Sequence, residues 1–186
     1  MKRLFFALCV VCLSAACTRK AADAPKAASE TVTETTASEP AAESPEADSH
    51  QYRDLALPGI GGSMMKISEY VGKNKLVLVD FWASWCGPCR AEMPAVVKTY
   101  ADFHPKGLEV VGVSFDNNKA AWEKAVGDLN MAWPQMSDLK GWESEGAVVY
   151  NIRAIPSNVL IDEQGRIIAK DLRGEELYNK VAELLK

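Results

Sequence analysis

Trp85-Cys86-Gly87-Pro88-Cys89 places two thiols three positions apart, directly after the apolar run Leu76–Trp82. The run is typical of a buried central strand, and we expect a helix to begin at the thiol pair. A helix N-terminus offers unpaired N–H groups and the positive end of the helix dipole, which stabilise a thiolate. Because the thiolate is the nucleophile of disulfide exchange, the stretch predicts a reactive dithiol. The second thiol lies on the same helical face and can close the disulfide.

Two other uses of a Cys-x-x-Cys motif fit this chain less well. A structural zinc site needs four protein ligands. After the first seventeen residues the only cysteines are Cys86 and Cys89, and the only histidines are His50 and His104. We therefore expect no metal site. A purely structural bridge is also disfavoured, because closing so short a loop gains little entropy.

The patterns of residues 52–186 predict one α/β domain. The turn sequence Asp162–Gly165 favours an antiparallel hairpin between the last two strands. The expected elements are an N-terminal hairpin around Gly59–Gly62, a strand over 76–81, a helix over 87–103, a strand over 108–115, helices over 118–130 and 141–149, strands over 157–161 and 166–172, and a helix over 175–185.

The segment Val79–Arg90 resembles the active-site segment of thioredoxin. Glu92-Met93-Pro94 and Val110–Asp116 are similar to segments of the TlpA/ResA-like thiol-disulfide oxidoreductases, an extracytoplasmic branch of that superfamily related to the AhpC/TSA proteins. The resemblance implies a thioredoxin-like fold over residues 52–186. That fold has a central mixed sheet flanked by helices, with an N-terminal hairpin and a helical insert. It also implies that the Cys86–Cys89 disulfide is the redox centre and that no cofactor is bound.

Asp80 interrupts the otherwise apolar strand before the motif. A carboxyl group at this place should be buried, and burial raises its pKa. A partly protonated acid beneath the dithiol could take the proton of Cys89, and thioredoxin has an aspartate at the matching place. A hydrogen-bonded structural aspartate is the alternative.

Glu92 lies three residues beyond Cys89, on the helix face that the thiols share. In the TlpA/ResA-like branch, an acidic residue at this place is implied in tuning the thiol pair. The alternative is a first-turn glutamate that complements the dipole of its own helix.

Ile155-Pro156 stands directly before a predicted strand, where proline is sterically permitted. The resemblance implies a cis peptide bond that faces the dithiol, with Pro156 shaping a substrate groove. The backbone of Ile155 would then pair with an extended substrate, a sequence-tolerant mode of binding. Together with Trp85, Gly87 and Pro88 of the motif, these are the predicted substrate-binding residues.

Three further tryptophans, Trp122, Trp133 and Trp142, fall in the insert. Aromatic side chains in a domain of this kind usually belong to the core, so we expect all three to be buried. The alternative is that the insert forms part of a partner-recognition surface.

Residues 1–16 are typical of a secretory signal peptide. A basic start precedes the apolar run Leu4–Leu13, which is too short to span a bilayer, and small residues follow it. Cys17 comes directly after them, which indicates a bacterial lipoprotein lipidated on Cys17, although Leu13 stands four places before it, not the usual three. The alternatives are a soluble secreted protein cut near Ala16 and an uncleaved anchor.

Residues 17–51 are predicted to form a disordered, low-complexity tether, because they carry too little apolar surface to offset the entropy of ordering. Cys9 and Cys12 would leave with the signal peptide, so the exported chain keeps no spare thiol, as suits an oxidising compartment. The net charge of −4 argues against nucleic acid as a partner.

These observations predict a monomeric reductase of protein disulfides, anchored in the membrane of a bacterium and facing the periplasm. A membrane thiol donor would re-reduce it, and the family implies cytochrome c maturation or thiol repair as candidate processes. The alternatives are a thiol oxidase or isomerase, with the opposite electron flow, and a thiol peroxidase of the related peroxiredoxin group. A non-catalytic binding lipoprotein is a third possibility.

Overall fold

The computed structural model describes residues 50–186. The predicted signal peptide, Cys17 and all but two residues of the predicted tether therefore lie outside the described residues. No helix within residues 50–186 is long and apolar enough to cross a membrane.

Five strands form one mixed sheet in the order β5-β4-β3-β6-β7. The central strand β3 (Leu76–Trp82) runs parallel to β4 (Leu108–Ser114) and antiparallel to β6 (Ser157–Asp162). On the outside, β5 (Gln135–Met136) runs parallel to β4, and β7 (Ile167–Lys170) pairs with β6 as the predicted antiparallel hairpin. The mixed sheet is confirmed, but β5 was not predicted, because two residues give no periodic signal.

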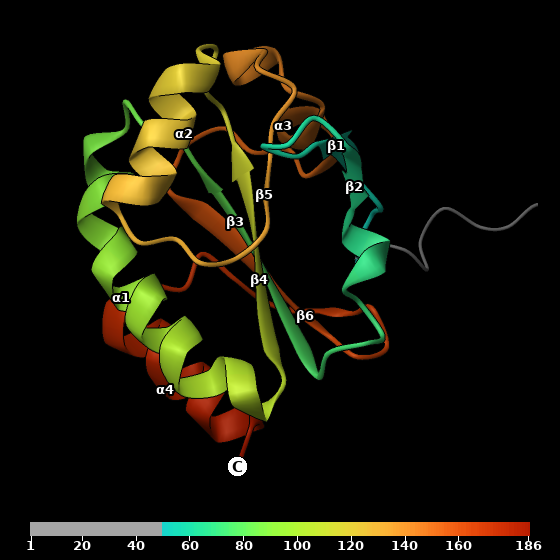
Figure 1. The fold of residues 1–186 in the computed structure, drawn as a ribbon. Helices are drawn as coiled ribbons and strands as arrows, with labels where there is room; N and C mark the ends of the chain where they lie inside the picture. Colours follow the sequence, from blue (N-terminus) through green and yellow to red (C-terminus); the bar gives the residue numbers. More distant parts are fainter. Residues whose placement is uncertain (1–49) are drawn as a thin grey trace, which may run out of the picture. The chain divides into compact units, whose positions relative to one another are not determined.

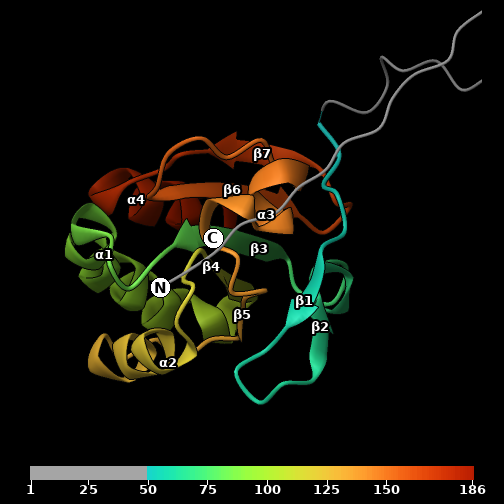
Figure 2. The ribbon, with the colours of Figure 1, turned by 90° about the horizontal axis from the view of Figure 1, so that it is seen from above.

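Helices cover both faces of this sheet. In Figures 1 and 2 the helices α1, α2 and α4 lie to one side of the sheet, while α3 and the separate β1–β2 hairpin lie to the other. The bounds are β1 Ala56–Pro58, β2 Met64–Lys66, α1 Gly87–Phe103, α2 Lys119–Asp128, α3 Glu145–Val149 and α4 Gly174–Leu184. The N-terminal hairpin and the helical character of the segment between β4 and β6 are therefore both confirmed.

The segment 141–149 is not the single helix that we expected. A 3-10 turn spans Gly141–Glu143, and α3 begins only at Glu145. Ser144 between them has an extended backbone, and its hydroxyl accepts a hydrogen bond from the N–H of Gly146 at 3.2 Å. The serine thus caps a new helix, as serine at an N-cap commonly does.

The core is densest around the two central strands, whose residues are all buried. Strands covered on both faces read as continuous apolar runs, which is why β3 and β4 were recognisable. Trp122 and Trp133 also belong to the core, with 1% and 3% of their surface exposed. For Trp142 the expectation of burial is wrong, because 48% of it is exposed.

Candidate active site

Cys86 and Cys89 form a closed disulfide at the start of α1, with their Cα atoms 5.3 Å apart. Cys86 is the N-cap residue, and its Sγ accepts a hydrogen bond from the N–H of Cys89 at 3.2 Å. Pro88 occupies the first turn, where its missing N–H costs nothing. When the bond is reduced, the same N–H and the helix dipole would stabilise a thiolate on Cys86.

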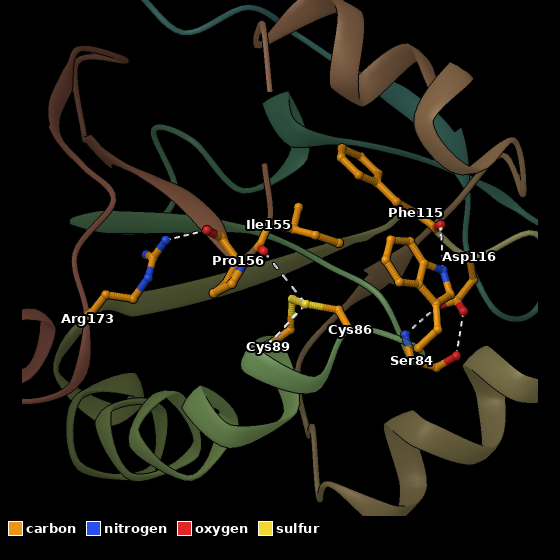
Figure 3. The surroundings of a disulfide bond; sticks show 9 residues. Ser84, Cys86, Cys89, Phe115, Asp116, Ile155, Pro156 and Arg173 are labelled. Atoms are coloured by element: carbon orange, nitrogen blue, oxygen red, sulfur yellow. Dashed lines mark hydrogen bonds between the residues drawn. A yellow bond between two sulfur atoms is a disulfide. The ribbon is translucent and has the colours of Figure 1, made fainter. Parts of the chain in front are cut away.

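The Ile155-Pro156 peptide bond is cis, as predicted. The carbonyl oxygen of Ile155 lies 3.8 Å from Cys86 Sγ, so the loop faces the disulfide (Figure 3). Gly87 is exposed and leaves open space where a side chain would stand, and Pro88 is also exposed. The carbonyl of Ile155 therefore lies beside Cys86 and the adjoining Gly87 and Pro88 are accessible, whereas the binding of substrate by these residues stays a prediction.

A buried aspartate that we did not predict as a site residue holds the loop before Cys86. Asp116 accepts hydrogen bonds from the N–H of Ser84 at 2.9 Å and from its hydroxyl at 2.5 Å (Figure 3). The hydroxyl of Ser114 donates to the same carboxylate at 2.7 Å. One feature of the sequence could have predicted the contact between Ser84 and Asp116. Each residue follows one of two parallel strands, and the carboxyl ends of such strands meet at one edge of a sheet.

Trp85 lies at the rim of the site, with 52% of its surface exposed. Its indole N–H donates to the carbonyl of Phe115 at 3.3 Å, which fixes the ring beside the disulfide loop. The ring of Trp142 lies 6.3 Å from it and 5.5 Å from the ring of Phe115. Trp142 is therefore part of an exposed aromatic pair next to the motif.

Asp80 is buried in the middle of β3, with 3% of its surface exposed. Its pKa is raised from 3.8 to about 7, and burial is the main cause. The Arg173 guanidinium opposes this rise, whereas the carboxylate of Glu92 adds to it. Its Oδ2 has no hydrogen-bond partner. The predicted burial and raised pKa are confirmed, whereas the role of Asp80 as a base stays a prediction.

Glu92 takes a position that neither expectation described. Its Oε1 accepts a hydrogen bond from the N–H of Gly174 at 2.6 Å, at the first residue of α4. The carboxylate thus complements the dipole of a neighbouring helix and not of its own. Within residues 50–186, Glu92 makes no hydrogen bond to Cys86 or Cys89. Any effect of Glu92 on the ionisation of the thiols would therefore act through its charge.

Comparison with known proteins identifies the family. Residues 49–170, well over half of the chain, match the AhpC/TSA family. The chain belongs to this family. The ResA thiol-disulfide oxidoreductase of Bacillus thuringiensis subsp. konkukian is 29% identical over 125 residues, which cover 67% of this chain and 69% of ResA.

Solved structures agree with this assignment. The thioredoxin domain of a thiol-disulfide oxidoreductase from Bacteroides vulgatus is similar with a TM-score of 0.68 and 34% identity, covering 73% of this chain and 96% of that one. A thiol:disulfide interchange protein from a Bacteroides species has a TM-score of 0.66 and 33% identity, covering 73% and 88%. The protein is therefore a TlpA/ResA-like member of the thioredoxin superfamily, with a thioredoxin-like fold, and it is a thiol-disulfide oxidoreductase.

No group of three or more histidine, cysteine, aspartate or glutamate side chains that could hold a metal ion occurs within residues 50–186.

Proposed function

We propose that the protein reduces disulfide bonds of extracytoplasmic proteins while a lipid on Cys17 holds it at the membrane. The observation that supports the dithiol chemistry of this proposal is the hydrogen bond from the N–H of Cys89 to Cys86 Sγ at 3.2 Å. Cys86 is also the more exposed sulfur residue, at 5% against 1% for Cys89. These features support Cys86 as the attacking thiolate and Cys89 as the resolving thiol.

The reaction follows in two steps. The Cys86 thiolate attacks one sulfur of the substrate disulfide, and the other substrate sulfur leaves as a thiolate and takes up a proton. Cys89 then gives its proton to the Asp80 carboxylate and attacks Cys86 Sγ, which releases the second substrate sulfur. Two electrons pass to the substrate, and the Cys86–Cys89 disulfide remains, so the reaction needs no bound cofactor. A membrane thiol donor would return the protein to its reduced form.

The ionisation of Asp80 suits this second step. With a pKa of about 7, the carboxylate and the neutral acid are both populated at neutral pH. A group with this property can accept a proton from a thiol and lose it again without a large barrier.

The surface around Cys86 suits an extended protein segment as substrate. The backbone of Ile155 offers strand-like pairing beside the sulfur, and the aromatic pair Trp85–Trp142 offers an apolar contact. Such mixed surfaces favour binding to many partners.

Trapping of the mixed disulfide tests this proposal. A Cys89→Ser variant cannot resolve the intermediate, so it should retain substrate on Cys86, and mass spectrometry after non-reducing separation would identify that substrate. The matched Cys86→Ser variant should trap nothing. Absence of any adduct on Cys89→Ser in cells that make the protein would contradict the proposed function.

The direction of electron flow is tested by the reduction potential. Gly87 and Pro88 between the thiols resemble thioredoxin, whose potential is about −270 mV, whereas the oxidant DsbA lies near −120 mV. We expect a value close to that of thioredoxin, and a value above roughly −150 mV would favour an oxidase. Peroxide consumption faster than the reduction of insulin would favour a peroxidase.

A further inference from the structure

Arg173 occupies the N-cap position of α4 and joins the segment before this helix to the loop of Pro156. One guanidinium nitrogen donates to the carbonyl of Leu172 at 2.8 Å, and another donates to the carbonyl of Pro156 (Figure 3). The carboxylate of Asp171 lies 3.7 Å away as a partly exposed ion pair. Through Pro156, this cation contacts the same loop that faces Cys86.

The sheet also places the segment that carries Arg173 on the face of Asp80. Asp80 on β3 pairs directly with Asn158 on β6, so their side chains share one face of the sheet. The side chain of Asn158 donates to the carbonyl of Leu172 at 2.8 Å and accepts from its N–H at 3.0 Å. These two bonds fix the segment before α4 on the face of Asp80, and Arg173 is the next residue.

The groups that face Asp80 come from every neighbouring element. Helix α1 contributes the charge of Glu92, the N-cap of α4 contributes that of Arg173, and β6 contributes the neutral Asn158. On β4 the paired residue is Gly112, which has no side chain. Glu92 and Arg173 therefore act on Asp80 with opposite charges, and both are fixed to the N-terminus of α4.

We propose that Arg173 is a positioning residue that keeps Asp80 able to ionise beneath the dithiol while it holds the Pro156 carbonyl of the substrate loop. The proposal rests on the proposed function, because Asp80 matters to catalysis only if it takes the proton of Cys89. In that step the proton moves from Cys89 Sγ to an Asp80 carboxylate oxygen, and Arg173 exchanges no proton.

The two neighbours of Asp80 predict shifts of opposite sign. Arg173→Gln removes a cation that favours the ionised carboxylate, so Asp80 should titrate at higher pH. Glu92→Gln removes an anion that opposes ionisation, so Asp80 should titrate at lower pH. Arg173→Lys keeps the cation but loses the planar fork that reaches two carbonyls, so it should preserve the titration and alter substrate affinity.

The direct test is the titration of the Asp80 carboxyl carbon by NMR in the oxidised protein, in which neither cysteine titrates. We expect Arg173→Gln to move the midpoint upward by about one pH unit and Glu92→Gln to move it downward. Arg166→Gln, which breaks a pair with Asp162 at 2.7 Å, is the matched control for the first variant. Glu123→Gln, whose partner Lys119 lies 3.3 Å away, is the control for the second.

A kinetic measurement connects the titration to function. The pH profile for resolution of a preformed mixed disulfide should shift with the same signs, and Arg173→Lys should restore it. An unchanged Asp80 midpoint in Arg173→Gln would overturn the inference, and Arg173→Met takes its place if the glutamine variant does not fold. A wild-type protein that reduces no disulfide, but whose Asp80 responds as described, would instead refute the proposed function alone.

Discussion

Asp80 places an ionisable group in the least hydrated part of the molecule. Its neighbours along β3 are entirely apolar, and its Oδ2 has no hydrogen-bond partner. Burying a carboxylate without full compensation costs stability, and this cost appears as the raised pKa. A buried carboxyl group with a raised pKa is typical of functional sites, where perturbed pKa values concentrate.

The same carboxyl group predicts how stability depends on pH. Because the folded pKa of about 7 exceeds the unfolded value of 3.8, the folded protein binds the proton more tightly between these values. Stability should therefore fall as pH rises from about 4 to 7 and stay level above that. Asp80→Asn removes this dependence, and at pH 8 it should raise the free energy of unfolding by at most about 4 kcal/mol, less the cost of an unpaired amide.

Urea unfolding of the oxidised proteins between pH 4 and pH 8 checks this prediction. The curves of wild type and Asp80→Asn should converge near pH 4, where both side chains are neutral. Asp128→Asn, on an exposed carboxylate of α2, should leave the pH dependence unchanged. A gap between wild type and Asp80→Asn that is constant with pH would contradict the raised pKa.

Individual residues differed in how far the sequence could predict them. The burial of Asp80 followed from the apolar run around it, and the cis bond before Pro156 followed from the family resemblance. Arg173 and Asp116 were not predicted, because their partners Pro156 and Ser84 lie 17 and 32 positions away. Contacts of that kind depend on how strands and helices pack, which no local pattern encodes.

At the scale of elements, the register of two strands explains the clamp on the disulfide loop. Trp82 at the end of β3 pairs with Ser114 at the end of β4. Ser84 lies two residues beyond Trp82, and Asp116 lies two residues beyond Ser114. The parallel register of the two strands therefore brings Ser84 and Asp116 side by side. The loop that presents Cys86 is thus positioned by the adjacent strand, and the clamp is buried, because only 1% of Asp116 is exposed.

Asp116→Asn should weaken this clamp. The amide loses the charge-assisted bonds to Ser84 and Ser114, so we expect a loss of about 2–3 kcal/mol in the free energy of unfolding and slower disulfide reduction. Asp54 offers a matched control, because it binds the N–H and hydroxyl of Ser68 in the same way at 2.9 and 2.8 Å but is exposed. Asp54→Asn should cost less than about 1 kcal/mol, and equal losses in the two variants would refute the clamp.

Short elements show why the boundaries were harder to predict than the central strands. The side chain of Gln135 on β5 accepts a hydrogen bond from the indole of Trp82 at 3.1 Å. The side chain of Gln135 fits only because Gly112, the residue opposite, has no side chain. A Cβ atom on Gly112 would lie 2.2 Å from Gln135 Oε1. The strand therefore exists through tertiary packing, whereas β3 and β4 are visible in their own composition.

At the scale of the whole chain, the proposed function depends on where the domain works. If the Gly-Pro dithiol has the low potential that we propose, it reduces substrates only as long as electrons reach it. In an oxidising compartment those electrons would have to come from a membrane donor. Lipid on Cys17 would keep the domain beside such a donor and raise its local concentration. The location of the protein is therefore a direct test of the proposed electron route.

Replacement of Cys17 distinguishes the anchored form from a freely secreted one. Two lipid chains or more hold a protein stably at a bilayer, so Cys17→Ser should move the protein from the membrane fraction to the soluble extracytoplasmic fraction. Cys12→Ser, within the predicted signal peptide, changes a cysteine of the same leader and should leave fractionation unchanged. Intact mass of the mature protein would show the lipid on the wild type alone. If the wild type were already soluble and began at Cys17 without added mass, cleavage near Ala16 would be the correct account, and the membrane donor would have to reach an untethered domain.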